Sequence, residues 1–208
     1  MKFMMLMIVI LIAGWSFAMW NPFGEESELP ANTFQVGNYT FYEELDGTYS
    51  IFARIEDNEI NYVELPKDAT TKFVFRADPR NVSEIYLDAT AAAKVISSKK
   101  IYLAFNPNQP DLGQMGIATY EVSRMTAEVY RIQTIGVFTE DAVPPDPNVP
   151  LRTCADATNT TTVITFEITN TTTKVYSAGN CVYVQGADAD GLILAADRLG
   201  MALVNILL

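Results

Sequence analysis

The sequence predicts a domain of the α/β class, with α+β as the alternative, behind an apolar N-terminal helix. Three observations support this prediction: short strand patterns separated by turn residues fill positions 38–76, a strand–helix–strand pattern covers positions 101–139, and an apolar helix pattern fills positions 191–208. The expected architecture is an antiparallel β-meander that leads into a mixed sheet with two or three packed helices. Residues 33–208 are long enough to form one such domain.

The N-terminal residues 1–23 form an apolar segment whose one charge is that of Lys2. About 20 apolar residues cross a bilayer, and residues 3–20 nearly reach that length and include two tryptophans suited to the interface. The same segment fits a secretory signal that is cleaved near Ala18. We expect either an anchor that contacts the lipid bilayer through residues 3–20 or a signal peptide, and an extracytoplasmic location for the remaining chain in both cases.

The segment after the apolar helix begins with a polar linker, residues 24–32, and continues as a meander. Asp46-Gly47 is a strong signal for a two-residue hairpin, and Asp57-Asn58 offers a second tight turn. The expected strands are residues 38–45, 49–56, 60–65 and 71–76.

The middle of the chain alternates between helix and strand patterns. Asp88 can cap a short helix at residues 89–97, and residues 101–105 favour a strand that is buried on both faces. A longer helix follows, with Glu121 and Arg124 away from its apolar stripe, and residues 135–139 then predict a strand that completes a parallel crossover. The stripe consists of Met115, Ala118, Val122, Met125, Val129 and Ile132.

The last third of the chain opens with four prolines in residues 142–150, which we interpret as a long surface loop rather than a linker between two domains. Two further patterns suggest a hairpin and a buried strand before a closing helix at residues 191–208, which Asp188 or Asp190 can cap. That helix contains only two charges, so it should be largely buried. The hairpin pattern covers residues 162–168 and 174–176, and the strand pattern covers residues 181–185.

The two cysteines, Cys154 and Cys181, are expected to pair, because an exported domain with two cysteines usually forms a disulfide. Two separate buried thiols are the alternative. Four Asn-x-Ser/Thr sequons predict glycosylation sites on exposed loops, although the threonine-rich composition of residues 153–173 raises the number of such triplets. The sequon asparagines are Asn38, Asn81, Asn159 and Asn170.

The composition excludes several classes of function. The sequence has no histidine, which removes Ser-His and Cys-His nucleophile pairs and the usual zinc sites. The net charge of −11 argues against a nucleic-acid partner, which would need clustered cations.

Polar residues follow four expected strands, and the ends of strands are where an α/β fold binds ligands. Carboxylates that converge there with Asn106 would suit Ca²⁺ or Mg²⁺. Helix capping and turn formation explain the same residues more simply, so we assign no catalytic, cofactor-binding or metal-binding residue and expect no cofactor. The residues concerned are Arg76, Asp78, Arg80, Asn106, Asp111, Glu140, Asp141, Asp188 and Asp190.

A resemblance is carried by NCVYVQGADADGLILAADRLGMALVNIL, preceded by FVFRADPRNVSEIYLD and IYLAFNPNQPDLGQMGIATYEVSRM. These stretches resemble uncharacterised exported proteins of archaea. The order of strand, Gly-x-Asp-x-Asp and a helix with Ala-Ala is also similar to the strand–helix repeats of archaeal S-layer proteins. The resemblance covers residues 72–208 and implies an envelope role, although Asn106-Pro107 stands where those repeats often have two glycines.

Together these observations predict a membrane-tethered, glycosylated extracytoplasmic protein with a structural or interaction role in a cell envelope, not an enzyme. Its expected partners are other envelope proteins or further copies of itself. The alternative is a small-ligand or carbohydrate-binding domain, or an accessory subunit of a membrane complex, which tyrosines exposed beside a cleft would favour. A carboxylate-dependent hydrolase is the third possibility, and it requires two acidic side chains in one deep pocket.

Overall fold

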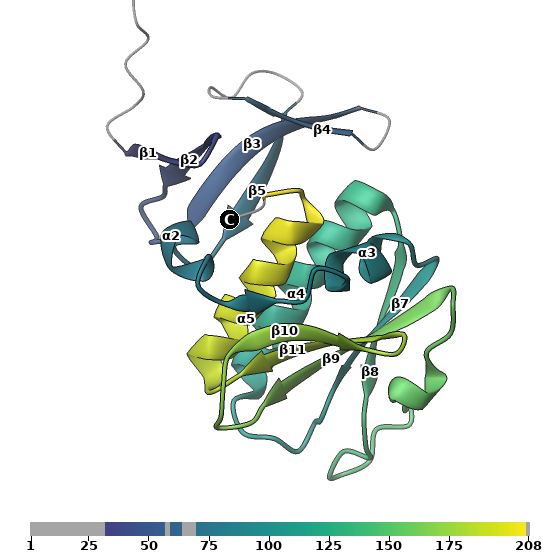
Figure 1. Ribbon diagram of the computed structural model, residues 1–208. Coiled ribbons are helices and arrows are strands. Elements are labelled where there is room, and N and C mark those ends of the chain that lie inside the picture. The colour runs from purple at the N-terminus through teal and green to yellow at the C-terminus, as the bar shows by residue number, and fades with distance from the viewer. Residues whose placement is uncertain (1–31, 57–58, 64–69, 207–208) are drawn as a thin grey trace, which may run out of the picture. The chain divides into compact units, whose positions relative to one another are not determined.

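The computed structural model describes residues 32–56, 59–63 and 70–206 (Figure 1). The chain divides into two units, Met1–Ala31 and Asn32–Leu208, and the description concerns the second. The expected anchor or signal, residues 1–23, and the linker apart from Asn32 lie outside the described residues. Within the described ranges, no helix has both the length and the apolar character needed to span a membrane.

Sheet A is the predicted antiparallel meander, in which β3 pairs with β2, β4 and β5, and β1 pairs with β2. Asp46-Gly47 lies in the turn between β2 and β3 as expected, but the turn is longer than the predicted two residues, because the Glu44 amide donates to the Thr48 carbonyl at 2.8 Å. The Asp46 carboxylate accepts hydrogen bonds from the Thr48 amide (3.0 Å) and hydroxyl (2.7 Å), and Gly47 has a φ of 80°. The strands are β1 (Thr33–Val36), β2 (Tyr39–Glu43), β3 (Tyr49–Glu56), β4 (Glu59–Val63) and β5 (Thr71–Phe75). Strand β1 is not among the predicted strands.

Sheet B is mixed and contains β6 to β11 in the order β6-β10-β11-β9-β7-β8. The strands β11, β9, β7 and β8 run parallel, whereas β10 is antiparallel to β11. The unit of β7, α4 and β8 is the predicted parallel crossover. The elements are α2 (Pro79–Val82), β6 (Tyr86–Leu87), α3 (Ala91–Ile96), β7 (Lys100–Phe105), α4 (Leu112–Tyr130), β8 (Gln133–Phe138), the 3₁₀ helix η1 (Cys154–Asp156), β9 (Thr161–Ile168), β10 (Lys174–Ala178), β11 (Cys181–Gly186) and α5 (Ala189–Leu203). The fold is therefore of the predicted α/β class.

The predicted hairpin between residues 162–168 and 174–176 is wrong. Strand β9 has parallel neighbours on both edges, β7 and β11, so β10 pairs with β11 instead. The tight turn lies at Gly179-Asn180, where Gly179 has a φ of 58°. Gly-Asn is itself a hairpin signal, and it identifies the correct pair of strands.

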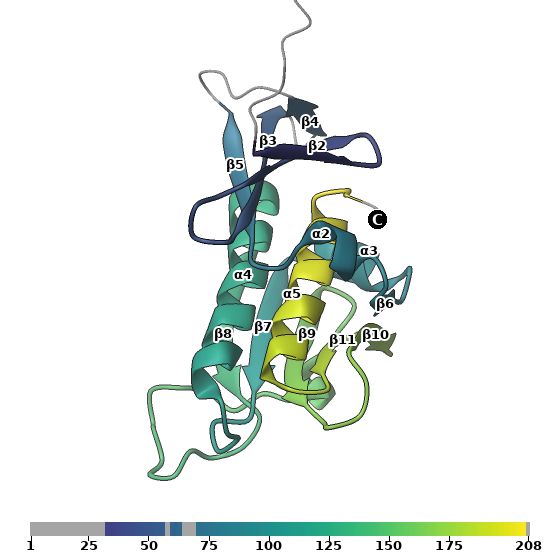
Figure 2. The ribbon, with the colours of Figure 1, turned by 90° about the vertical axis from the view of Figure 1, so that its left-hand side faces the viewer.

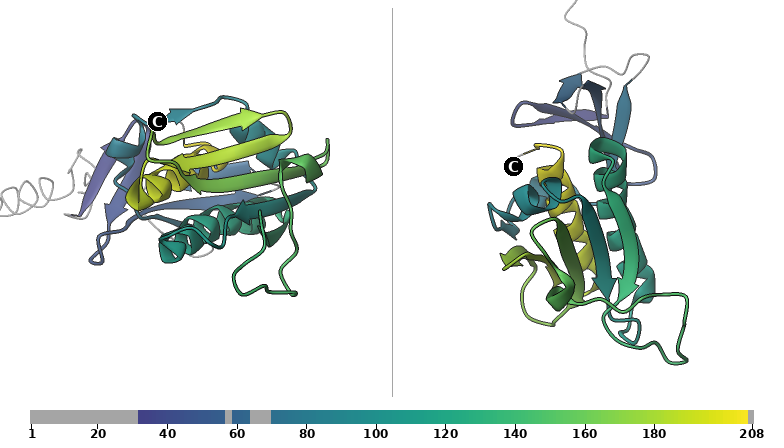
Figure 3. Two further views of the ribbon diagram at one scale, coloured as in Figure 1. Left: turned by 90° about the horizontal axis from the view of Figure 1, so that it is seen from below. Right: turned by 90° about the vertical axis from the view of Figure 1, so that its right-hand side faces the viewer.

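Sheet A and sheet B share one hydrophobic core, which also includes residues of the helices and lies on one face of sheet B. Figure 2 shows α4 and α5 side by side across that face of sheet B. The opposite face is covered, among the described elements, by η1 and not by an α-helix (Figure 3, right). The core therefore leaves a second face of sheet B for other contacts.

The capping residues differ in part from the prediction. The Asp188 carboxylate caps α5 by accepting a hydrogen bond from the Gly191 amide at 2.7 Å, and this helix ends at Leu203, earlier than predicted. Asp88 does not cap α3 directly, because the N-cap is Thr90 and the Asp88 carboxylate binds Thr90 and Ser177.

The C-terminal end of α5 is held by three tyrosines from other elements. Tyr39 of β2 donates a hydrogen bond to the Asn205 carbonyl at 2.8 Å. Tyr62 of β4 and Tyr130 of α4 donate hydrogen bonds to the carbonyls of residues 204 and 203. These bonds satisfy carbonyls that the end of a helix leaves without partners.

Candidate functional site

Of the polar residues at the ends of the parallel strands, Asn106 closes a turn and Asp188 caps α5, whereas Asp111 precedes α4 without a side-chain cap bond. Asn106 accepts a hydrogen bond from the Asn108 amide at 2.8 Å, which closes a turn. Asn108, which sequence reasoning did not select, donates from its side chain to the Glu140 carboxylate (3.0 Å) and the Asp141 carbonyl (2.8 Å). Among the described residues, no group of three or more carboxylates or cysteines is placed to hold a metal ion.

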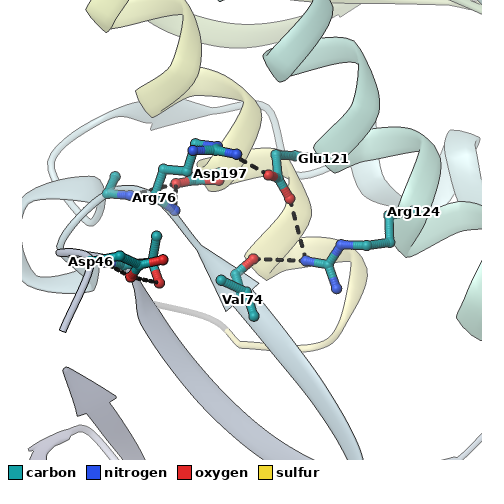
Figure 4. A network of polar contacts seen from close by, with 8 residues as sticks. Asp46, Val74, Arg76, Glu121, Arg124 and Asp197 are labelled. Atoms are coloured by element: carbon teal, nitrogen blue, oxygen red, sulfur yellow. Dashed lines mark hydrogen bonds and ion pairs between the residues drawn. The ribbon is translucent and has the colours of Figure 1, made fainter. Parts of the chain in front are cut away.

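The predicted group Arg76, Asp78 and Arg80 is divided in the structure. Arg80 pairs with Asp78, with Nε 2.8 Å from the carboxylate, and its guanidinium lies 4.4 Å from the centre of the Phe34 ring. This guanidinium holds the pKa of Asp78 below its ordinary value. Arg76 instead joins a buried cluster with Glu121 of α4 (Figure 4).

The buried cluster is centred on Asp197, which lies in the middle of α5 and is 1% exposed. One carboxylate oxygen accepts hydrogen bonds from the amides of Arg76 (2.8 Å) and Ala77 (2.7 Å), the residues that follow β5. The other oxygen, Oδ1, has no hydrogen-bond partner among the described residues. Burial raises the pKa of Asp197 to about 7, and the neighbouring Glu121 adds to this effect. Asp197 therefore attaches the end of sheet A to α5.

Glu121 is the second carboxylate of the cluster and is 6% exposed. It accepts hydrogen bonds from Arg76 Nε at 3.2 Å and Arg124 Nη2 at 3.3 Å. Arg124 also donates to the carbonyl of Val74 in β5 at 2.7 Å. The helix pattern correctly separates Glu121 from the apolar stripe of α4 but does not reveal that the end of sheet A buries it.

A cavity of about 270 Å³ lies beside this cluster, between α5 and the chain that follows β5. Its lining combines two charged residues, Arg76 and Asp190, with Ala77, Ile193 and Leu194. The buried carboxylates of Asp197 and Glu121 are not part of this lining, and both are bound by main-chain amides or guanidinium groups. The arrangement is that of a structural junction, because a substrate in the cavity would meet only one carboxylate, that of Asp190.

The helix-free face of sheet B carries a second group of polar side chains. We call it the tyrosine face and define it by Tyr86, Tyr102, Tyr176, Tyr183, Lys100, Lys174 and Arg152. The strand register places Tyr176 opposite Tyr183 and Tyr86 opposite Lys174, so these side chains share one face. The rings of Tyr176 and Tyr183 stack, with centroids 4.8 Å apart.

The cations of the tyrosine face lie against its rings. Lys174 Nζ is 4.7 Å from the centre of the Tyr176 ring, and Lys100 Nζ is 5.4 Å from that of Tyr102. The Arg152 guanidinium is 5.6 Å from the same Tyr102 ring and lowers the pKa of that phenol. Sequence reasoning missed this group because the wrong hairpin register did not place β10 beside β11.

The predicted disulfide is present: Cys154 of η1 is bonded to Cys181 of β11. Cys181 is completely buried in a small apolar cluster with Val163, and Tyr102 and Tyr183 pack against this cluster. The bond therefore fixes η1 and the preceding proline-rich loop to the tyrosine face. A disulfide of this kind is typical of an oxidising, extracytoplasmic location.

The four sequon asparagines, Asn38, Asn81, Asn159 and Asn170, are all exposed. Asn38 lies between β1 and β2, and Asn81 lies in α2. Asn159 precedes β9 and Asn170 follows it. Each amide is thus reachable from solvent, while glycosylation at these positions stays a prediction.

Comparison of the chain with protein-family models, with curated proteins and with solved structures finds no match. The function is therefore inferred from the geometry of the described residues.

Proposed function

We propose that this protein is an extracytoplasmic domain of a cell envelope, tethered to the membrane by residues 3–20, that acts through contacts with other envelope molecules. The observation that carries the proposal is the disulfide between Cys154 and Cys181, because such bonds persist in oxidising compartments. The exposure of four sequon asparagines is consistent with an outward-facing, glycosylated surface. The resemblance of residues 72–208 to S-layer repeats supports envelope partners or self-assembly.

Fractionation of cells that express the full-length chain tests this proposal. We expect the protein in the membrane fraction, the domain cleavable by protease added outside, and both cysteines unreactive towards a thiol reagent until they are reduced. The Cys154→Ala variant is the control, because it leaves Cys181 as one reactive thiol after denaturation. A cytoplasmic protein with two free thiols would contradict the proposal. A mature chain that begins at Met19 would show that the apolar segment is cleaved and that the protein is secreted and not tethered.

The second candidate function is binding of a small ligand or carbohydrate, and the tyrosine face is the observation that favours it. Tyr86 is 63% exposed, and the neighbouring strands add Tyr176 and Tyr183 to the same face. Tyrosine combines a flat apolar ring with a polar hydroxyl, which suits contact with molecules that carry both kinds of surface. A ligand of this kind is compatible with an envelope location.

A further inference from the structure

The tyrosine face crosses most of the width of sheet B. From Tyr86 on β6 to Tyr102 on β7 there are four strand-to-strand steps, through β10, β11 and β9. At the usual spacing of neighbouring strands, these steps correspond to about 19 Å. The face therefore matches an extended ligand better than a single small molecule.

The charge of this face differs from that of the whole chain. The protein has a net charge of −11, yet Lys174 lies beside Tyr176 at one side of the face, and Lys100 and Arg152 lie beside Tyr102 at the other. Asp156 lies 3.9 Å from Arg152, and the Glu167 carboxylate on the same face interacts with Lys174, so both offset part of this positive charge. The two separated cationic groups are complementary to an extended ligand with negative charges along its length.

The side chains between the cationic groups are the hydrogen-bonding groups of Thr165, Glu167 and Tyr183, which lie beside the fully buried Val163 and Cys181. Thr165 and Glu167 of β9 share the face with Tyr183 of β11, whereas the neighbouring Gln185 is buried and its amide already donates to the Thr172 carbonyl at 2.7 Å. The Tyr176 hydroxyl donates to the Glu167 carboxylate at 3.4 Å, a long bond that a competing hydroxyl can replace. Such donors and acceptors match the hydroxyl groups of a sugar, while Tyr86 offers an exposed ring against which the C–H groups of a sugar can pack.

An extended peptide fits this face less well. A peptide is usually bound along the edge of a sheet or with its side chains in pockets, whereas the tyrosine face extends across the strands from the edge strand β6 to β7.

We propose that the tyrosine face binds an extended acidic carbohydrate whose sugar units carry carboxylate groups. This inference rests on the proposed extracytoplasmic location, where such polymers occur. The ring of Tyr86 packs on the sugar, and Lys174, Lys100 and Arg152 pair with its carboxylates.

Binding of labelled polygalacturonate fragments to the full-length protein in detergent micelles tests the inference. We expect Tyr86→Ala to weaken binding about tenfold and Lys174→Gln to weaken it roughly threefold, the latter effect shrinking at high salt. The matched controls are Tyr120→Ala, which removes a tyrosine of similar exposure (61%) on α4, and Lys94→Gln on α3. Both controls should bind like the unmodified protein.

Two competitors distinguish the possible ligands. Neutral dextran should compete poorly, and polyglutamate of equal charge should also compete poorly. Tighter binding of polyglutamate would show that the ligand is an acidic peptide and not a carbohydrate. Equal losses of affinity in the test and control variants would show that polygalacturonate does not bind at the tyrosine face. If fractionation places the domain on the extracytoplasmic side of the membrane and the protein does not bind polygalacturonate, this inference alone is overturned. A cytoplasmic location would overturn the proposed function.

Discussion

At the scale of single residues, Asp197 is the most consequential side chain of the described structure. It joins two main-chain amides that follow β5 to the middle of α5, although one of its oxygens has no partner among the described residues. A carboxylate in this position is costly when ionised, since burial disfavours its charge. The strength of the attachment between sheet A and α5 should therefore depend on whether Asp197 is protonated, and hence on pH.

The free energy of unfolding should consequently depend on pH. Folding raises the pKa of Asp197 from its ordinary value near 3.8 to about 7, so the folded state binds the proton more tightly. This contribution to stability is complete below pH 4 and is lost as pH rises towards 7, by roughly 2–4 kcal/mol. Asp197→Asn keeps an acceptor for both amides and should remove the dependence, which denaturant unfolding between pH 4 and pH 8 would measure.

The control for this measurement is Asp190→Asn, which changes an exposed aspartate of the same helix. This variant should retain the pH profile of the unmodified protein. Parallel profiles for Asp197→Asn and the unmodified protein would contradict the role assigned to Asp197.

At the scale of elements, the strand-to-helix connection from β11 to α5 depends on Gly186. A β-carbon added to this residue would lie 2.3 Å from the Leu192 nitrogen and 2.5 Å from the Asp188 carbonyl oxygen. Both neighbours are backbone atoms that cannot move aside as a side chain could. The first turn of α5 thus packs directly on the end of β11 because position 186 has no side chain.

Replacement of this glycine should therefore be damaging. Gly186→Ala is expected to lower the free energy of unfolding by about 3 kcal/mol, because the added methyl group forces the backbone apart. Gly113→Ala is the matched control: it lies in the exposed part of α4 with nothing within 4 Å of the added carbon, and it should raise stability by about 0.5–1 kcal/mol. Denaturant melts of both variants would measure the difference, and a similar small effect at both positions would contradict the packing argument.

The elements also show which features a sequence can reveal. The turn at Asp46-Gly47 and the apolar stripe of α4 depend on local chemistry. The position of the turn and the stripe from Met115 to Val129 were predicted correctly, whereas Ile132 lies beyond the helix, which ends at Tyr130. The Gly179-Asn180 turn signal records the pairing of β10 with β11, whereas the pairing of β9 with β7 and β11 joins segments far apart in the chain, and no local pattern records it. The tyrosine face is assembled across this non-local pairing, so it could not be recognised from the alternation within any one strand.

At the scale of the whole molecule, the disulfide fixes η1 and the proline-rich loop to a strand in the middle of sheet B. Cys154 and Cys181 are separated by 27 residues. In the loop-entropy model, closing a loop of that length stabilises the folded state by about 3.5 kcal/mol.

Removal of this bond should be measurable in stability and in local opening. The double variant Cys154→Ala, Cys181→Ala is expected to lose about 3.5 kcal/mol in denaturant unfolding. It should also be cleaved faster by protease within residues 139–160, because the covalent link between η1 and β11 is lost. The unmodified protein under reducing conditions is the control and should behave in the same way. Equal stability and equal cleavage with and without the bond would show that packing alone holds the loop.

The three tyrosines that hold the end of α5 have a consequence for biogenesis. Tyr39 binds a carbonyl that lies 166 residues further along the chain, and Tyr62 binds one that lies 142 residues further. Sheet A can form its own strand pairs early, but it cannot complete its contacts until the residues around position 205 have been synthesised. Contacts of such long range form slowly. Sheet A thus completes its packing only after α5 has been synthesised, an order that suits the proposed export of the domain.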